Sequence, residues 1–423
     1  MKEERFSGYR MVVVCCVFLF LIFGANASFP TMLKSIVAEN NMQLADAALY
    51  TTFCAGISAV LGFFVTPILL KKVPARALMC VAAVCMILNS FILSKATQYW
   101  QIYLAGSLAG LAQGVGAIAT CSALVASWFI KKRTQMTGYV AAASGLGAAG
   151  FTALIGVLSE THTYRQIYTI FTVLVGVLVI LCILLIRSTP SSMGQKPLGF
   201  GEEEAVPEAK VETGEASGLT LSEARRKPAL WVIYLFNIIG MMGYYSVIMY
   251  MQTLLTTVGG MSTLQAAMIN TVYALYAAFL MTQNARVRKW FGPIGYYVVT
   301  GIFVLCGTLV VAVLAPNAFK FTWIYYVATF FIAFAAVRAT LDSQSATVDL
   351  FGMKDYSSIQ AMLVSAQTFG QILAAPLLKL LTQGIGLELN RCYFVYAVLI
   401  IIPCIGFLIA YKITPQKYWD RAK

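Results

Sequence analysis

Two side chains of opposite charge, Arg338 and Asp342, interrupt a long, mainly apolar stretch of the sequence from Trp323 to Leu350. Arg338 lies near its middle and Asp342 follows four residues later, so a helix would place both on one face. A guanidinium binds a carboxylate through two parallel hydrogen bonds and stays charged at any working pH. A neighbouring carboxyl group binds a proton more easily when the arginine binds another anion, because the carboxylate then loses the positive charge that favours its ionised form. The pair predicts either an anion site with an adjacent proton site or a structural ion pair.

The rest of the chain has the composition of a protein that lives in a bilayer. Of its 423 residues 60% are hydrophobic and 11% charged, and the mean hydropathy is +0.78. A charge at the centre of a membrane helix costs about 3 kcal/mol, so it persists beside a partner, a water-filled cavity or a ligand. We therefore expect a multi-pass membrane protein and take Arg338 as the centre of its site.

The apolar runs define the elements that must position this pair. About 20 apolar residues cross a hydrocarbon core, and twelve such runs are predicted. Six are near 9–33, 44–70, 77–95, 98–127, 134–158 and 164–187, and six near 229–258, 264–285, 293–315, 321–350, 356–382 and 391–412. Between them, 188–228 is rich in Glu, Pro, Gly and Ser, which is typical of a mobile linker. We predict an all-α membrane protein with twelve transmembrane helices in two six-helix bundles, 1–187 and 229–423, joined by the cytoplasmic linker 188–228.

The basic residues report topology. The net charge is +13, but Lys and Arg occur in short clusters between apolar runs and form no single stripe, so no nucleic-acid surface is predicted. Most of them fall in the termini and in alternate loops, which places both termini in the cytoplasm. The first run, Met11 to Leu33, is longer than a signal-peptide core, and we expect it to be retained.

No enzymatic motif is present in the sequence. The ten cysteines lie within apolar runs without a CxxC pair, which favours neither disulfides nor a metal site. The one histidine, His162, falls in a predicted loop. HExxH, GxSxG and Walker sequences are missing, so we expect no enzyme, no cofactor and no ATP-driven step. We expect an ion gradient or a solute gradient to supply the energy for any active process of this protein.

Glycines recur every four residues in the fourth predicted helix, at Gly106, Gly110 and Gly114. Small residues at this spacing let membrane helices approach closely. We predict a helix contact along this face.

Two stretches carry a family resemblance: Trp128 to Arg133 followed by Ser144 to Gly147, and Arg187 to Gly199 after the sixth helix. With its two six-helix halves, the chain resembles the major facilitator superfamily, and more narrowly its oxalate/formate antiporter and monocarboxylate porter branch. This resemblance implies the major facilitator fold, in which the halves rock about a midplane site. It also implies a bacterial cytoplasmic (inner) membrane.

In that superfamily helices 1, 4, 7 and 10 line the cavity, which adds polar residues to the predicted solute pocket. Besides Arg338, the substrate-binding candidates are Gln113, Tyr244, Tyr245, Asn26 and Tyr273. Hydroxyl and amide donors in an apolar wall suit a small organic acid. Each of them could instead make an interhelical hydrogen bond. Asp342 is the proton-coupling candidate, or else a permanently charged partner of Arg338.

The resemblance also implies a cytoplasmic gate. The superfamily's loop motif after helix 2 has an acidic residue where this chain has Lys71 and a glycine where it has Pro74. The matching loop after helix 8 has Arg288 at the acid's place. The gating candidates are Lys71, Lys72, Arg76, Arg288 and Asp349, the last as a gate or as a contact of Lys354.

These observations predict a secondary active transporter of a small mono- or dicarboxylate, working by proton symport or anion exchange through alternating access. Its expected partners are the carboxylate, protons or a counter-anion, and the lipid bilayer, and it is expected to be monomeric. One alternative is an efflux carrier for amphipathic anions or drugs, favoured by the many aromatic residues. Another is a non-transporting sensor or scaffold that uses the acidic linker to recruit a partner.

Overall fold

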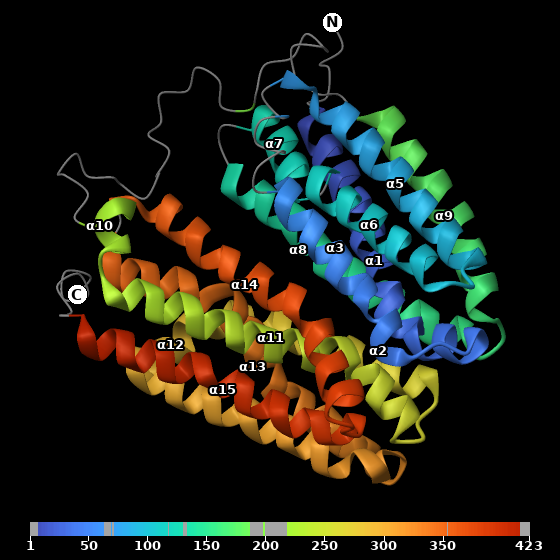
Figure 1. Cartoon of the computed structure of the whole chain (residues 1–423). Helices are drawn as coiled ribbons and strands as arrows, with labels where there is room; N and C mark the ends of the chain where they lie inside the picture. Colours follow the sequence, from blue (N-terminus) through green and yellow to red (C-terminus); the bar gives the residue numbers. More distant parts are fainter. Residues whose placement is uncertain are drawn as a thin grey trace, which may run out of the picture. The chain divides into compact units, whose positions relative to one another are not determined.

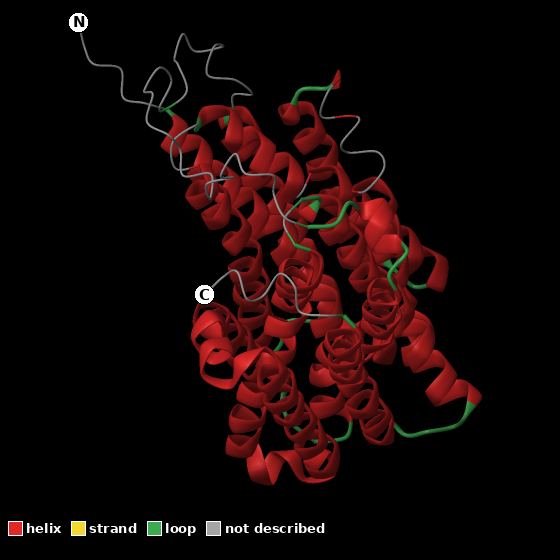
Figure 2. Ribbon diagram, turned by 90° about the vertical axis from the view of Figure 1, so that its left-hand side faces the viewer, coloured by secondary structure: helices red, strands yellow, loops and turns green. Residues whose placement is uncertain are grey.

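The computed structural model describes residues 7–62, 69, 72–116, 118–129, 133–186, 198, 218–352 and 354–414. These residues form helices and connecting loops, without a strand of their own (Figure 2). A helix satisfies every backbone N–H and C=O within one segment, which is why apolar sequences adopt it in lipid. The chain divides into two compact units, Met1–Pro207 and Glu208–Lys423, with the division inside the predicted linker 188–228.

The N-terminal unit is a bundle of helices in the order of the sequence (Figure 1). They are α1 (Gly8–Asn40), α2 (Leu44–Ala47), α3 (Leu49–Val60), α5 (Ala75–Lys95), α6 (Tyr99–Gly116), α7 (Ile118–Trp128), α8 (Arg133–Leu158) and α9 (Tyr164–Leu185). The predicted glycine contact is confirmed: a Cβ added at Gly106 or Gly110 of α6 would lie 2.5 Å from the carbonyl oxygen of Tyr50 or Cys54 on α3. Glycine lets these two backbones meet directly.

The C-terminal unit contains a second set of helices (Figure 1). They are α10 (Leu221–Arg225), α11 (Pro228–Thr257), α12 (Thr263–Leu314), the short 3-10 helix η3 (Ala315–Phe321), α13 (Thr322–Phe351), α14 (Tyr356–Lys379), the π-helical turn η4 (Leu380–Gly384) and α15 (Leu389–Ile413). The loop predicted at 286–292 is largely helical, and the break between the two predicted helices is confined to Gly292, with φ 66° and ψ 170°. Glycine adopts this conformation without the Cβ clash of other residues.

The end of the predicted linker is folded against the C-terminal unit. The backbone N–H of Leu219 donates to the carbonyl of Phe351 at 2.8 Å, and that of Leu221 donates to the Asp355 carboxylate at 2.8 Å. Thr220 and Glu223 cap α10 reciprocally, and these hydrogen bonds lower the pKa of the Glu223 carboxyl. The prediction of a mobile linker up to residue 228 is therefore wrong for 218–227, because capping and Asp355 order this segment.

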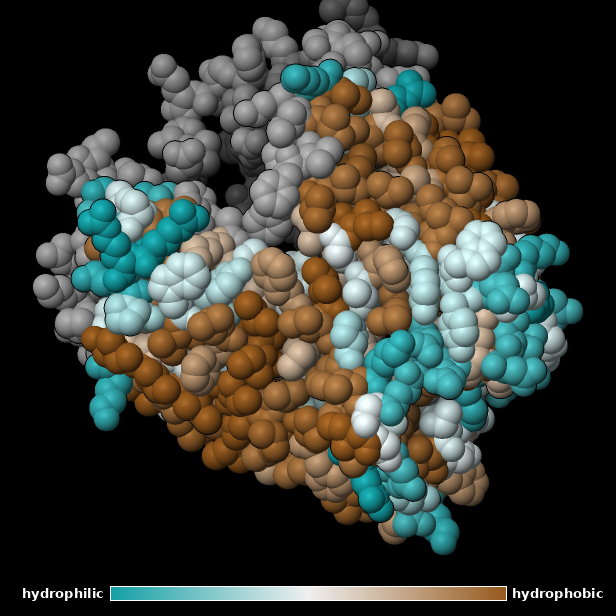
Figure 3. Space-filling model, in the orientation of Figure 1, coloured by the Kyte–Doolittle hydropathy of each residue, from teal (hydrophilic) through white to brown (hydrophobic). Residues whose placement is uncertain are grey.

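Eight helical stretches of the described chain are long and apolar enough to cross a membrane. They are Gly8–Asn40, Ala75–Lys95, Tyr99–Val125, Tyr164–Leu185, Pro228–Thr257, Thr263–Met281, Ile294–Ala339 and Leu389–Ile413. Two shorter apolar helices, Leu44–Val60 and Ala142–Leu158, accompany them. Large apolar side chains cover much of the outer surface of each unit (Figure 3), as expected where lipid is the solvent. The chain is a multi-pass membrane protein, and the count of twelve spans and the cytoplasmic termini stay predictions.

Candidate functional site

Arg338 and Asp342 form an ion pair on α13. The Nε of Arg338 lies 3.1 Å from Oδ2 of Asp342, and the two residues are only 6% and 3% exposed. Four residues make just over one helical turn, so the helix itself brings the side chains together. For the Nη1 and Nη2 groups of Arg338 there is no hydrogen-bond acceptor among the described residues. The buried guanidinium therefore keeps donors for a further acceptor.

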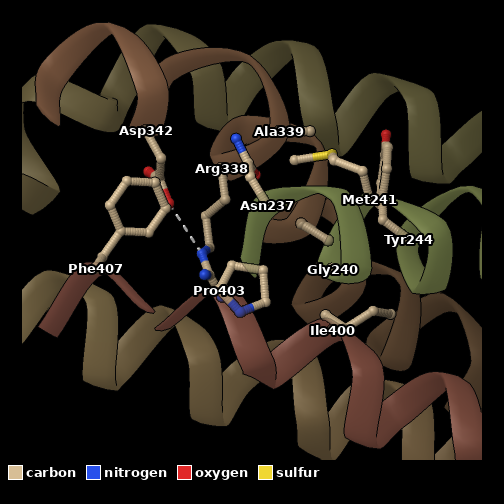
Figure 4. A pocket seen from close by; sticks show the side chains of 11 residues that line it. Asn237, Gly240, Met241, Tyr244, Arg338, Ala339, Asp342, Ile400, Pro403 and Phe407 are labelled. Atoms are coloured by element: carbon tan, nitrogen blue, oxygen red, sulfur yellow. Dashed lines mark hydrogen bonds and ion pairs between the residues drawn. The ribbon is translucent and has the colours of Figure 1, made fainter. Parts of the chain in front are cut away.

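A small cavity of about 20 Å³ lies beside this pair within the C-terminal unit (Figure 4). Three helices supply its lining: Asn237, Gly240, Met241 and Tyr244 from α11, Ala335, Arg338, Ala339 and Asp342 from α13, and Ile400, Pro403 and Phe407 from α15. A volume of this size is room for about one water molecule. In the conformation observed here the cavity is therefore too small for an organic acid.

Asn237 is a site residue that the sequence reasoning missed. It is 2% exposed and lines the cavity near Arg338 (Figure 4). Its side chain makes no hydrogen bond to any residue that the structure describes, although buried amides are normally paired. The sequence feature that could have indicated Asn237 is the presence of a single Asn in the apolar run 229–258. Asn237 adds an unused donor and acceptor to the cavity.

The three tyrosines that were predicted to bind substrate form a second cluster in the same unit. The Tyr244 hydroxyl lies 3.1 Å from that of Tyr273 on α12, and the rings of Tyr244 and Tyr245 pack with centroids 5.1 Å apart. Since Tyr244 also lines the cavity, it joins this cluster to the ion pair. Tyr245 and Tyr273 do not line the cavity themselves.

The backbone of α13 is held in place next to the pair. Gln367 of α14 donates from Nε2 to the carbonyl oxygen of Ala339, and the same nitrogen lies 3.4 Å from the Ser343 hydroxyl. Gln360 reaches Ser343 as well, at 3.4 Å. These amides fix the turn of α13 from which Arg338 and Asp342 project.

The two predicted pocket residues of the N-terminal unit have different surroundings. Asn26 of α1 accepts hydrogen bonds through Oδ1 from the Tyr50 hydroxyl at 3.4 Å and from the Cys54 thiol at 3.6 Å. The Nε2 of Gln113 on α6 is buried and has no hydrogen-bond partner in the described part of the chain. Asn26 thus makes interhelical hydrogen bonds, whereas Gln113 has a donor without a partner in the described part of the chain.

The gating candidates Arg288 and Asp349 meet although 61 positions separate them. Arg288 Nη2 forms an ion pair with Asp349 Oδ2, the Tyr411 hydroxyl donates to the same oxygen, and Arg288 Nη2 lies 3.1 Å from the Tyr411 hydroxyl. Burial disfavours the charged guanidinium, but Tyr297, Tyr411 and Asp349 outweigh it and raise the pKa of Arg288 above its usual value. This triad joins α12, α13 and α15, and Arg288 takes the place beside Asp349 that was expected for Lys354.

The other gating candidates are not brought together. Lys72 is exposed, and Arg76 lies in the first turn of α5. Lys71 lies outside the described residues.

In the described part of the chain no group of three or more His, Cys, Asp or Glu side chains could hold a metal ion, and the ten cysteines are free thiols.

The described residues are helical, both units carry apolar outer surfaces, and the C-terminal unit holds a buried ion pair, as in proteins that cross a membrane. The chain belongs to the Major Facilitator Superfamily, whose family model matches residues 14–344. It is therefore a transporter and not an enzyme.

Solved structures of three transporters share the fold. A bacterial homologue of the human lysosomal transporter Spinster, inward-facing and occupied, has 12% identity over 97% of this chain and 98% of its own, with a TM-score of 0.72. A D-xylose-proton symporter has 13% identity over 96% and 98%, with a TM-score of 0.71. The nucleoside transporter NupG has 12% identity over 95% and 99%, with a TM-score of 0.69. No curated protein matches the sequence significantly.

Proposed function

We propose that this protein is a secondary active transporter of a small organic anion, a mono- or dicarboxylate, and that it works by alternating access. The observation that supports this most directly is the buried guanidinium of Arg338, which uses Nε for Asp342 and leaves both Nη groups without an acceptor among the described residues. Two parallel N–H groups are the partner that a carboxylate fits.

Coupling follows from competition for Arg338. Without solute, Asp342 neutralises the guanidinium, and the cavity has room for about one water molecule. When a carboxylate takes over Arg338, the Asp342 carboxylate loses its counter-charge in a buried site, where an isolated charge is unfavourable, and it binds a proton. Proton and anion would then move together. If the protein works by anion exchange, a second anion binds at Arg338 and is carried in the opposite direction, and no proton is transported.

In this proton-coupled transport, the residues around Arg338 and Asp342 would bind the solute or hold the helices together. Asn237 and Tyr244 would hydrogen-bond the rest of the solute, while Gln113, Asn26, Tyr245 and Tyr273 stay predicted contacts. The Arg288–Asp349–Tyr411 triad would hold α12, α13 and α15 together at one end of the unit and release them during transport. The oxalate/formate and monocarboxylate branch, a bacterial cytoplasmic membrane and a monomeric state complete the proposal.

A neutral hydroxylated solute is the second candidate. The Arg338–Asp342 pair carries no net charge, and the cavity next to it offers an amide and a phenol. Two of the structural neighbours are a D-xylose-proton symporter and a nucleoside transporter. In this version the ion pair serves proton coupling alone.

Counterflow in proteoliposomes separates these functions. Labelled formate, lactate, pyruvate and oxalate would be compared with xylose and uridine in the wild type and in Arg338→Gln. The control is Arg286→Gln, an exposed arginine whose guanidinium donates to Gln283 of the same helix. Carboxylate counterflow that disappears in Arg338→Gln and persists in Arg286→Gln supports the proposal. Counterflow of xylose or uridine alone supports the second candidate, and transport of bulky dyes that does not depend on Arg338 supports an efflux carrier.

A further inference from the structure

A basic pocket lies at one end of the N-terminal unit, where α5 ends and α9 begins. Its volume is about 470 Å³, and its lining includes Lys95, His162, Arg165, Gln166, Thr169 and Ile170. None of these residues belongs to the proposed solute site, and the pocket is far larger than the cavity beside Arg338. Its position at the ends of two apolar spans, Ala75–Lys95 and Tyr164–Leu185, corresponds to the depth of lipid headgroups.

Hydrogen bonds from the protein hold one of the two cations of this pocket, Arg165, in place. The Arg165 Nη2 donates to Asn40 Oδ1 at 2.9 Å and to the Ala96 carbonyl at 3.3 Å, and its Nε lies 3.7 Å from Glu39. Lys95, in the last turn of α5, is exposed and has no partner among the described residues. Glu39 offsets one of the two cations, so the pocket keeps a net positive charge.

An apolar surface continues from this pocket along α9. Ile170 lines the pocket, and Val173, Leu174 and Val177 follow it at helical spacing, with exposed fractions of 37%, 63%, 40% and 53% in chain order. Phe91 of the neighbouring α5 is 51% exposed. Figure 3 shows apolar side chains over the region of α5 and α9 that Figure 1 labels. An acyl chain could lie on this strip while its headgroup occupies the pocket.

We propose that this pocket binds the phosphate of an anionic glycerophospholipid. Lys and Arg are the side chains that hold phosphate oxygens through charge-assisted hydrogen bonds. Free phosphate offers the same oxygens, but it makes no use of the apolar strip below. By the positive-inside rule Lys and Arg are scarce on the side predicted to be external, yet this pocket brings two of them together there.

Native mass spectrometry of the delipidated, full-length protein tests this. The probes are phosphatidylglycerol, phosphatidylcholine with the same acyl chains, and inorganic phosphate. We expect preferential binding of phosphatidylglycerol and about fivefold weaker binding in Lys95→Gln, the effect of one basic residue near an anionic surface. Lys95→Arg should bind as the wild type does. The control Lys320→Gln removes an exposed lysine of the other unit and should change nothing.

The apolar strip has its own test. Leu174→Ser should weaken phosphatidylglycerol binding without any effect on inorganic phosphate. Equal binding of the two lipids, or equal losses in Lys95→Gln and Lys320→Gln, would overturn the proposal. Inorganic phosphate that binds as tightly as phosphatidylglycerol would make this a free-anion site and overturn the lipid assignment. Unfolding temperatures of the variants, measured in the same detergent, confirm that each variant is folded.

Discussion

Arg338 Nε and Asp342 Oδ2 lie 3.1 Å apart inside one helix, and both side chains are almost completely buried. Helical geometry creates this contact, while the packing of α11 and α15 over it keeps water out except in a cavity of about one water molecule. An ion pair in such a place is stable as a pair and unstable as two separate charges.

The first prediction concerns the cost of breaking this pair. Asp342→Leu should lower the free energy of unfolding by about 3–5 kcal/mol, because it leaves a buried guanidinium without a counter-charge. Arg338→Met should cost less, since Asp342 can bind a proton whereas arginine cannot lose one. The double variant should recover most of the loss. Unfolding titrations in mixed micelles measure these differences, and single variants as stable as the wild type would contradict them.

Asp342→Asn should separate exchange from proton-driven uptake. The amide oxygen can still accept from Arg338 Nε, so the site keeps its shape, but the side chain no longer binds a proton at working pH. Counterflow of the solute should persist while accumulation driven by a pH gradient disappears. Accumulation that survives in Asp342→Asn would show that the proton binds elsewhere.

Asn237→Leu should change stability and transport in opposite directions. It removes a buried amide that has no partner among the described residues, so the unfolding free energy should rise by about 1 kcal/mol. The lost hydrogen bond to the solute should raise KM about tenfold. Asn89→Leu is the matched control: Asn89 is fully buried and accepts from the Tyr50 hydroxyl at 3.2 Å, so this variant should be destabilised. The same sign of stability change in both variants would contradict the role given to Asn237.

A double-mutant cycle tests the contact between Arg288 and Asp349. Arg288→Gln and Asp349→Asn should show a coupling energy of about 1–3 kcal/mol, because the two side chains are only 17% and 18% exposed. The control pair Arg391 and Glu388 lies 3.8 Å apart with side chains 66% and 71% exposed, and its coupling should be below about 1 kcal/mol. Equal couplings in the two cycles would mean that burial does not strengthen the first pair.

Gly240→Ala should destabilise the C-terminal unit. A Cβ at this position of α11 would overlap the Pro403 ring of α15, and overpacking of this kind costs about 1–3 kcal/mol. Gly145→Ala, where no atom lies within 4 Å of an added Cβ, should cost nothing and can gain a few tenths of a kcal/mol from helix propensity. Unfolding temperatures that fall equally in both variants would contradict the contact.

The membrane class, most helix ranges and the pairing of Arg338 with Asp342 were all predictable from the amino-acid sequence. Each of these depends on local properties: apolar length sets the spans, and a spacing of four residues sets the contact on one helix. The close contact at Gly106 and Gly110 was predictable for the same reason. The helical stretch before Gly292 and the ordered segment 218–227 were not, because polar residues there are stabilised by partners such as Asp355 that lie far away in the sequence.

Contacts between residues far apart in the sequence depend on how the helices pack against one another. From the sequence, Asp349 could have contacted Lys354, which follows five residues later. The packing of α12 and α15 against α13 brings Arg288 and Tyr411 to Asp349 instead. Asn237 lines the cavity and Asn26 accepts a hydrogen bond from Tyr50 because of the way each helix is rotated about its own axis. The packing of neighbouring side chains sets that rotation. The size of the cavity beside Arg338 likewise depends on three helices at once, and no single stretch of sequence contains that information.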